Sequence, residues 1–449
     1  MKQFEIVIIG GGIAGLATAE IFARCGFKTL LVEKNAKLCT ESSGLHHEWF
    51  HFGSLYSIFP RNQFLCTMVK GIEDLLLYYS DFEGMNLRVR YTDGKLLTID
   101  NESGWIRKNK LQYLITDTKH ADFYLQFNRE IYQKFFMKFS WHFAVKQFIA
   151  RHNRFYQCDW RKGNASSYIP RFGWRDYSED RLFDFQSDEV NLSSAHHTIM
   201  QSYDSIMNAY QIISELTKSF LSNGGNILTD TRFENYQTIS NAILVNLNNK
   251  SVKTNKLILA TGKHLSKHAK QQLKVKTVLS PLLVAYPAVC STNFVRLTPF
   301  VLNTINHLKH TINGINYSLV GSGISVLEND EQSILNTQNN LLEKAKLVFP
   351  TLNQAKLINI YFGSKTELAD SVINRNYSYQ IKEIEPDTFV ILPGKFSLAF
   401  SLAINTFKQV VGHFPNPHIH YNKNLKVGNL IGLTKHKAIV KEFYETHQS

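Results

Sequence analysis

Three glycines near the start of the chain constrain its fold more than any other feature. Gly10, Gly12 and Gly15 form the spacing G-x-G-x-x-G directly after an apolar run rich in β-branched residues, Glu5–Ile9. Because glycine has no Cβ, this spacing permits a tight turn, the close approach of a pyrophosphate and close helix–strand packing. We therefore predict a buried strand, a turn, and a helix over Ile13–Cys25 whose N-terminus faces phosphate.

The residues that follow complete the pattern of a dinucleotide-binding βαβ unit. Gly26 stands where the helix should end, and Lys28–Val32 predicts the second strand. Glu33 then comes 18 residues after Gly15, near the offset of about 20 residues expected for an acid that bonds the ribose hydroxyls. A carboxylate there repels a 2′-phosphate, which favours NAD or FAD over NADP. The predicted contacts of this unit are Gly10, Gly12, Ile13, Ala14, Gly15, Glu33 and Lys34.

The same stretch has a second interpretation, as the apolar core of a secretion signal. Glu20 and Arg24 interrupt it, and no small-residue cleavage site follows, so we prefer the nucleotide site. The chain has no run of about 18 apolar residues, and we expect no transmembrane helix. Five scattered cysteines without a CxxC pair disfavour a disulfide framework or a zinc site and suit a reducing compartment. We expect a cytoplasmic protein without a metal.

The composition limits the class of protein and the kind of partner that we expect. With 449 residues, 44% of them hydrophobic and 19% charged, the chain is expected to be globular and to form at least two lobes. A formal net charge of +13 favours anionic partners such as phosphates, carboxylates, nucleic acid or a lipid surface, without choosing among them.

A middle segment narrows the choice of dinucleotide. After a helix over about Ala209–Asn223, the strand candidates are Ile227–Thr229, Ala242–Leu247 and Leu257–Leu259, followed by Ala260, Thr261 and Gly262. This layout is similar to the β-meander and the late strand ending in A-T/A-G of two-dinucleotide-fold flavoproteins. With the first motif, it resembles the FAD-dependent oxidoreductase family of D-amino acid oxidase, glycine oxidase, and glycerol-3-phosphate and L-2-hydroxyglutarate dehydrogenases.

The resemblance covers both ends and the middle of the chain and implies an α/β fold. A Rossmann-like FAD-binding domain of the glutathione-reductase type would be interleaved with an α+β substrate domain built on an antiparallel sheet. The FAD-binding domain would comprise 1–75, 191–275 and 385–449, and the substrate domain 76–190 and 276–384. With one full glycine fingerprint and no redox CxxC, a dedicated NAD(P)H site is disfavoured, and electrons are expected to come from the substrate.

Two features of positions 39–60 fit the family pattern. Ser42, Ser43 and Gly44 suit the small-residue turn that the family places beside the pyrophosphate, since they offer hydroxyls and a flexible backbone to phosphate. Further on, His51, Gly53 and Tyr56 are similar to the H-x-G-x-x-Y of the glycerol-3-phosphate and L-2-hydroxyglutarate branches.

A histidine near the flavin would accept the hydroxyl or ammonium proton as hydride leaves the substrate, because its pKa lies near neutrality. His46, His47 and His51 all remain candidates for that place, as does the alternative of a packed histidine that bonds a carbonyl. Covalent attachment of FAD through a histidine, known in some family members, is not expected here.

The C-terminal part supplies the third piece. A strand over Thr388–Leu392 is followed by Gly394, Lys395 and Phe396, and a helix begins near Ser397. In the family, a helix N-terminus at this place points at the flavin pyrimidine, where backbone N–H groups stabilise the negative charge of the reduced ring. Lys395 either adds a full positive charge there or is a solvated loop lysine.

Two further expectations concern the substrate domain. The family commonly uses an arginine as a two-pronged carboxylate clamp. Arg375 is the candidate here, with Tyr377 and Tyr379 as hydroxyl partners, and the alternative is a surface arginine.

An aromatic pattern predicts a helix in the same domain, because Phe127, Ile131, Phe135, Phe139 and Phe143 recur at i+4. They predict an amphipathic helix that packs on the substrate domain, or that contacts a membrane surface or nucleic acid.

We therefore expect an FAD-dependent oxidase or dehydrogenase that removes a hydride from the CH–OH or CH–NH carbon of a small anionic substrate. Hydroxy acids, amino acids and phosphorylated alcohols all qualify, and the electron acceptor stays open between oxygen and quinone. The catalytic candidates are His51, His47, Tyr56 and Arg375. The alternatives are a flavoprotein acting on a macromolecule such as a modified tRNA, although nucleic acid is not expected, or a non-catalytic nucleotide-binding protein.

Overall fold

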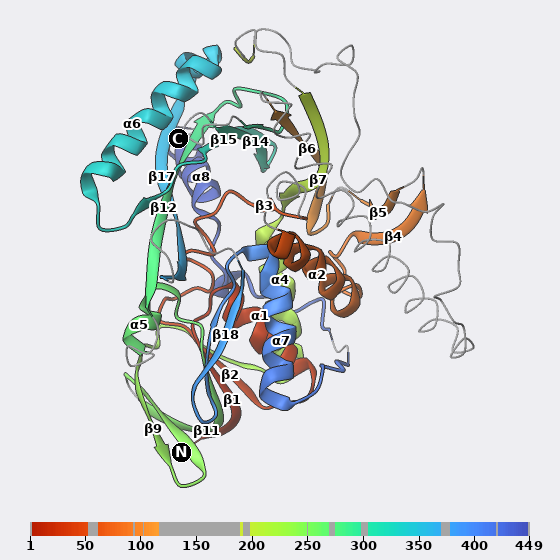
Figure 1. The fold of residues 1–449 in the computed structure, drawn as a ribbon, viewed down its shortest axis with the longest axis vertical. Coiled ribbons are helices and arrows are strands. Elements are labelled where there is room, and N and C mark those ends of the chain that lie inside the picture. The colour runs from red at the N-terminus through yellow and green to blue at the C-terminus, as the bar shows by residue number, and fades with distance from the viewer. Residues whose placement is uncertain are drawn as a thin grey trace.

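The computed structural model describes residues 2–52, 62–92, 95–101, 103–115, 189–191, 198–248, 250–268, 274–297, 304–369, 378–418 and 421–447. Gly53, Tyr56, Arg375 and Tyr377, and the predicted helix at 127–143, lie outside the described residues. Two large sheets organise the part that is described (Figure 1).

The first sheet has eight strands and a parallel centre. Strand β1 (Gln3–Ile9) pairs in parallel with β2 (Thr29–Val32) and β11 (Lys250–Leu259). Their inner residues are mostly Ile, Leu and Val and are buried, as expected for parallel strands covered on both faces. The remaining strands are β8 (Asn226–Leu228), β9 (Phe233–Ile239), β10 (Ala242–Leu247), β18 (Gln380–Glu385) and β19 (Thr388–Leu392).

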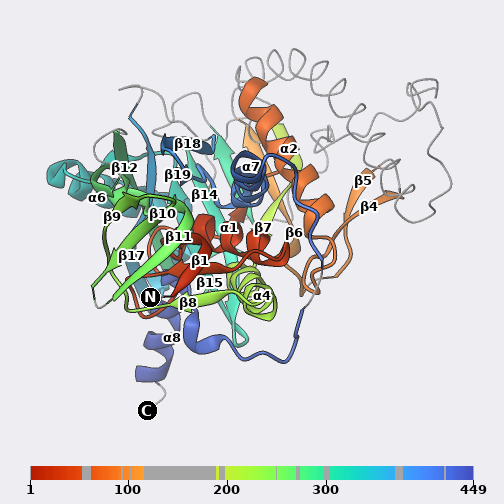
Figure 2. The ribbon, with the colours of Figure 1, turned by 90° about the horizontal axis from the view of Figure 1, so that it is seen from below.

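Beside this sheet lie helices α1 (Ile13–Arg24), α2 (Asn62–Tyr78), α4 (Ala209–Ser222) and α7 (Ala399–Val411) (Figures 1 and 2). Helix α1 is buried along its whole length, and its small and apolar residues allow close packing against neighbouring helices. It contacts α4 and α7, and α2 packs on α7. Because α1 is held on several sides, the turn at its N-terminus that contains Gly10, Gly12 and Gly15 has a fixed position. We call this segment the glycine turn.

The second sheet has nine strands and is mostly antiparallel. Its longest pair is β12 (Val275–Tyr286) with β17 (Leu357–Leu368). The other strands are β3 (Trp49–Phe50), β6 (Ile106–Ile115), β7 (Thr198–Met207), β13 (Phe294–Leu297), β14 (Ile305–Ile312), β15 (Ile315–Ser322) and β16 (Val326–Leu327). A separate ribbon joins β4 (Leu87–Thr92) to β5 (Lys95–Ile99).

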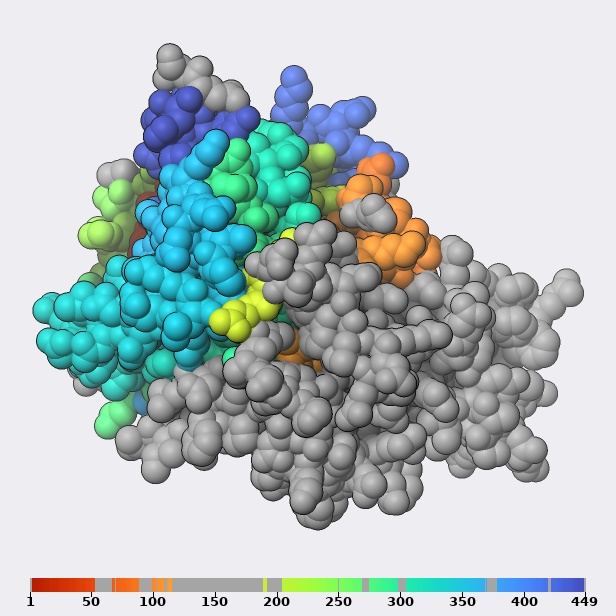
Figure 3. All heavy atoms as spheres, turned by 90° about the horizontal axis from the view of Figure 1, so that it is seen from above, coloured from red at the N-terminus to blue at the C-terminus, as the bar shows by residue number. Residues whose placement is uncertain are grey.

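Alternating residues of β12 bury the two faces of this sheet against different helices. Leu283 and Ala285 pack with α6 (Glu331–Val348), which lies at the molecular surface (Figure 3). Leu282 and Val284 belong instead to the cluster that includes Val440 of α8 (Lys435–His447). The period of two in the strand therefore places α6 and α8 on opposite faces.

The predicted fold class is confirmed. A β-meander is present, but it consists of β9, β10 and β11. Two of the strand candidates fall in β10 and β11, whereas the candidate at 227–229 corresponds to β8, which pairs with β2. The chain boundaries proposed for the two domains stay a prediction. No helix in the described ranges is both long and apolar enough to cross a membrane.

Candidate active site

A cavity of about 530 Å³ lies where the carboxyl ends of the parallel strands meet the second sheet. Ile9, Val32 and Leu392, at the ends of β1, β2 and β19, line one side. Ser280 of β12 and Lys365 of β17 line the other. The crevice beyond the carboxyl ends of parallel strands is where open α/β sheets bind ligands.

This cavity collects most of the predicted site residues. Those that line it are Gly10, Gly12, Ile13, Ala14, Glu33, Lys34, Ser42, Ser43, His46, His47, His51, Ala260, Thr261, Gly262, Gly394, Lys395 and Phe396. Gly15 and Gly44 do not line it. Three segments far apart in the sequence thus converge on one site, which no single motif specifies.

Two of the glycines, Gly10 and Gly15, leave no room for a side chain. Gly10 has φ +108°, and a Cβ there would lie 2.5 Å from the Ala260 carbonyl oxygen. A Cβ on Gly15 would lie 1.9 Å from the carbonyl oxygen of Gly10. Gly10 therefore brings the turn against the end of β11, and Gly15 lets helix α1 pack on the turn.

Glu33 lies at the cavity wall and is tied to the same turn. Its carboxylate accepts hydrogen bonds from the backbone N–H of Gly11 at 2.7 Å and of Asn35 at 2.9 Å. Burial raises the pKa of Glu33, and these two bonds oppose that rise. Each carboxylate oxygen retains capacity for another donor, so the residue fits a ribose hydroxyl.

The turn formed by Ser42, Ser43 and Gly44, here called the serine turn, caps helix α1 although it lies about 30 positions further along the chain. Gly12 is the N-cap and has no side chain, and Ser43 Oγ accepts the hydrogen bond of Ile13 N–H at 3.0 Å. Ser42 Oγ lies 2.9 Å from Ser364 Oγ of β17, which joins the turn to the second sheet.

Two buried polar atoms at the cavity suit a large polar cofactor. Within the described residues, Thr261 Oγ1 and Ser397 Oγ are buried without a hydrogen-bond partner, and both side chains belong to lining residues. Buried polar groups are normally satisfied. With the glycine turn and Glu33, these atoms fit a bound FAD.

The three histidines lie together at the cavity. His46 Nδ1 accepts the N–H of Glu48 at 2.9 Å, and its ring meets Phe396 edge to face at 4.9 Å. The His51 ring stacks on Trp49 at 4.4 Å between centroids. Burial, with a contribution from Lys395, lowers the pKa of His51 to about 4, so its imidazole is neutral at pH 7.

Asp204 lies behind His51, outside the cavity lining, and no motif in the sequence marks it. This fully buried side chain accepts the Phe52 N–H at 2.6 Å and the Tyr113 hydroxyl at 2.5 Å. Its Oδ2 lies 3.6 Å from His51 Nδ1. Only the pairing of β3 with β7 brings residues 51 and 204 together.

Two lysines give this part of the cavity a positive potential. Lys365 and Lys395 both line the cavity, and both contribute to lowering the pKa of His47 and of His51. Both ammonium groups therefore act on the two histidines, and an anion placed beside the histidines would be attracted.

Comparison with known proteins identifies the family and the fold of the chain. The family profile described as "FAD dependent oxidoreductase" (DAO) matches residues 5–391. Glycine oxidase from Geobacillus kaustophilus is 12% identical, with TM-score 0.62 over 97% of this chain and 99% of that one. L-α-glycerophosphate oxidase from Mycoplasma pneumoniae, solved with FAD bound, is 17% identical, with TM-score 0.61 over 94% and 98%.

A third similar structure is L-proline dehydrogenase from P. horikoshii, 13% identical with TM-score 0.62 over 92% of this chain and 94% of that one. The sequence matches none of the curated proteins compared with it. At these identities the structures establish the fold, and the family profile, which spans most of the chain, establishes the family. The chain belongs to the DAO family of FAD-dependent oxidoreductases, and it is an enzyme whose cofactor is FAD.

Proposed function

We propose that this enzyme removes a hydride from the CH–OH or CH–NH carbon of a small anionic substrate, with His51 as the base. The observation that carries the proposal is the composition of one cavity. It joins the glycine turn and Glu33 to a neutral buried histidine backed by Asp204 and to two lysines.

FAD, when bound, would supply the redox chemistry, because its ring system accepts hydride. Gly10, Gly12, Ser43 and Glu33 would hold its nucleotide half, and Gly394 to Ser397 its ring end. In the donor, the C–H electron pair leaves as hydride while the O–H or N–H proton passes to His51. A carbonyl or imine product results, so protons and electrons balance.

His51 is neutral at pH 7 and can accept a proton, but its pKa of about 4 makes it a weaker base than the near-neutral histidine that the sequence led us to expect. When it takes the proton, the Asp204 carboxylate, 3.6 Å from Nδ1, stabilises the imidazolium and keeps the ring in place. Asp204 is itself held by Phe52 N–H and Tyr113. Asp204 therefore acts as a positioning residue.

The charge of the cavity argues for an anionic donor. Lys365 and Lys395 would bind a carboxylate or phosphate group beside the histidines, and each hydrogen bond to a charged group is worth about 1.5–3 kcal/mol. Arg375 stays an additional candidate clamp. The named neighbours include oxidases of glycine and of glycerophosphate, and both substrate types carry an anionic group.

Anaerobic reduction of the enzyme-bound flavin tests this proposal. Hydroxy acids, amino acids and glycerol phosphates are each paired with a neutral analogue, such as an amide or an unphosphorylated alcohol. One anionic class should bleach the flavin absorbance, with its neutral partner reacting about 10- to 100-fold more slowly. Equal rates for the two partners would contradict the lysine role, and reduction only by a modified tRNA would replace the substrate class.

Substitution of the two lysines provides the matching structural test. Lys365→Met and Lys395→Met should each raise the KM for the anionic donor more than they lower kcat. Lys408→Met is the control, because Lys408 lies in α7, over the Phe414 ring and outside the cavity lining.

The electron acceptor and a cytoplasmic location belong to the same proposal. Oxygen and quinone are the two acceptors considered, and cysteines without a CxxC pair suit a reducing compartment. Mixing the reduced enzyme with oxygen or with a water-soluble quinone analogue distinguishes the acceptors, since the physiological type should reoxidise the flavin faster.

A further inference from the structure

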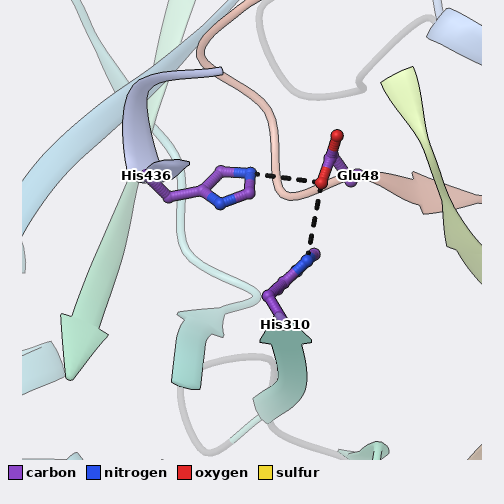
Figure 4. Close-up of side chains that lie close together, drawn as sticks. All are labelled: Glu48, His310 and His436. Atoms are coloured by element: carbon purple, nitrogen blue, oxygen red, sulfur yellow. Dashed lines mark ion pairs between the residues drawn. The ribbon is translucent and has the colours of Figure 1, made fainter. Parts of the chain in front are cut away.

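Three side chains from distant parts of the chain meet in a second polar cluster (Figure 4). Glu48 comes from the loop before β3, His310 from β14 and His436 from the start of α8. All three are fully buried, and none of them lines the cavity. The cluster is therefore separate from the candidate active site.

The distances within this cluster do not fit direct hydrogen bonds. Glu48 Oε2 lies 3.5 Å from His310 Nδ1 and 3.6 Å from His436 Nε2, whereas N–H···O bonds span about 2.7–3.2 Å. Within the described part of the chain, these three atoms have no hydrogen-bond partner. Three buried polar atoms that face one another unsatisfied indicate a missing ligand.

The same distances fit a shared metal ion. In a tetrahedral zinc site with bonds of about 2.1 Å, neighbouring ligand atoms lie roughly 3.4 Å apart. One ligand atom from each of the three residues lies within 4.8 Å of the other two. We propose that Glu48, His310 and His436 bind one zinc-class divalent cation, with water as the fourth ligand.

Two of the three proposed ligands have outer contacts of the kind found in metal sites, whereas His310 Nε2 has no hydrogen-bond partner within the described residues. The Tyr317 hydroxyl lies 2.7 Å from His436 Nδ1, and a proton on Nδ1 leaves the Nε2 lone pair facing the cluster. Glu48 Oε1 accepts hydrogen bonds from Lys437 Nζ at 2.8 Å and from Ala209 N–H at 3.1 Å, which leaves Oε2 to bind. Such outer contacts orient ligands in metalloproteins.

Local charge narrows the choice of ion. The Lys437 ammonium already offsets the Glu48 carboxylate, so electrostatic attraction to a dication is weakened. Ca²⁺ and Mg²⁺ prefer several oxygen ligands, and this site offers one carboxylate oxygen and two imidazoles. An ion with high imidazole affinity, Zn²⁺ above all, is therefore selected.

The ion would crosslink the loop before β3, strand β14 and helix α8. Glu48 adopts φ +57°, a left-handed conformation that non-glycine residues keep only where the surroundings hold it. Its loop also carries His46 and His47, and His51 follows β3 directly. A metal there would fix this loop against β14 and α8 and so hold the histidines at the cavity. Since the site is fully buried, the ion must enter during folding.

The sequence predicted no metal because it contains no short ligand motif. The three ligands stand at positions 48, 310 and 436, and the cysteines lack a zinc pattern. The pairing of the β-sheet and the docking of α8 bring them together. Only the folded structure carries this signal.

Metal analysis of the FAD-loaded protein tests the proposal. The protein is expressed with zinc in the medium and purified without chelators, and zinc and FAD are measured in the same sample. About one zinc per chain is expected. His310→Gln and His436→Gln should lose the zinc and keep FAD. Wild-type protein without zinc, or equal zinc in His310→Gln, would overturn the proposal.

His307 provides a matched control on the same strand. It is also a fully buried histidine, but its nitrogens lie 2.7 Å from the Thr292 carbonyl and 2.7 Å from Ser318 Oγ. His307→Gln should therefore retain the zinc, whatever its effect on stability.

A measurement on wild-type protein keeps the proposal testable if the variants do not fold. Protein unfolded in a chelator is refolded with FAD, with and without Zn²⁺, and Tm is compared. Zinc should raise Tm by several degrees, because it binds the folded state alone. Identical Tm values and no retained zinc would show that Glu48 and Lys437 form only an ion pair.

Discussion

At the scale of single residues, the proposed mechanism depends on groups whose pKa values are shifted by their neighbours. His51 is neutral because burial and Lys395 lower its pKa to about 4. Asp204 opposes that shift and is fixed by Phe52 and Tyr113. The proposed base is therefore a pair of residues, of which the sequence revealed one.

Replacing Asp204 tests this pair. Asp204→Asn keeps the shape of the side chain but removes the charge that stabilises the His51 imidazolium. The rate of flavin reduction at pH 7.5 should fall on the order of 10²-fold, as loss of general-base assistance predicts, with FAD content unchanged. Rapid-mixing absorbance measures the rate.

Asp330→Asn is the control for that substitution, because Asp330 is the exposed N-cap of α6. A rate in Asp204→Asn equal to that of the control would remove Asp204 from the mechanism. His51→Asn should be at least as slow as Asp204→Asn, and a normal rate there would shift the base role to His46 or His47.

At the scale of elements, helix α1 is positioned by a buried ionic network. Glu20 accepts hydrogen bonds from Ser219 of α4 at 2.6 Å and from Arg24, while Arg24 also donates to the Tyr78 carbonyl of α2. Burial raises the pKa of Glu20, and Arg24 opposes the rise. The network ties the helix behind the glycine turn to two neighbours.

Breaking this network on one side should be costly. Arg24→Met leaves the buried Glu20 carboxylate unpaired and should lower the free energy of unfolding by about 3–5 kcal/mol. The double variant Glu20→Met with Arg24→Met removes both charges and should recover much of that loss. Chemical denaturation followed by fluorescence gives both values. A double variant less stable than the single one would contradict the account.

The sequence predicted the elements of the first sheet better than the links between elements. Strands β10 and β19 have the bounds predicted for them, and α1 ends one residue earlier than expected. Strand β9 was not predicted, because most of its side chains are not buried and its pattern is weak. A short 3₁₀ turn, Phe396–Leu398, precedes α7 where the helix was expected to begin.

In the candidate site too, residues that belong to local patterns were predicted, and residues joined only by distant contacts were not. The glycine turn, Glu33 and the serine turn are local patterns, and their residues lie at the cavity except Gly15 and Gly44. Asp204 and the Glu48–His310–His436 cluster depend on contacts between segments more than 100 positions apart. Spacing in the sequence carries no information on such contacts.

At the scale of the whole molecule, buried neutral histidines couple stability to pH. Burial lowers the pKa values of His51 and His307 to about 4 each, against about 6.5 in an unfolded chain. Between these values the unfolded state binds more protons. Stability should therefore fall as pH drops below about 6.5, with up to about 1.4 kcal/mol per pH unit from each histidine.

Thermal unfolding between pH 7.5 and 5 measures this effect. Tm should decline steadily over the lower half of that range, and His307→Gln, which removes one of the titrating groups, should reduce the slope. A Tm that is constant or rises toward pH 5 would mean that these histidines are not buried neutral in the folded protein.

The central claim is that one cavity holds FAD with its reactive ring beside the three histidines and its nucleotide half at the glycine turn. A crystal structure of the FAD-loaded enzyme with a non-reactive anion tests it most directly. We predict density for the ring against His46, His51, Lys365 and Phe396, and for the anion near Lys365 or Lys395. Density for the adenine at the histidines, or for FAD outside this cavity, would contradict the account.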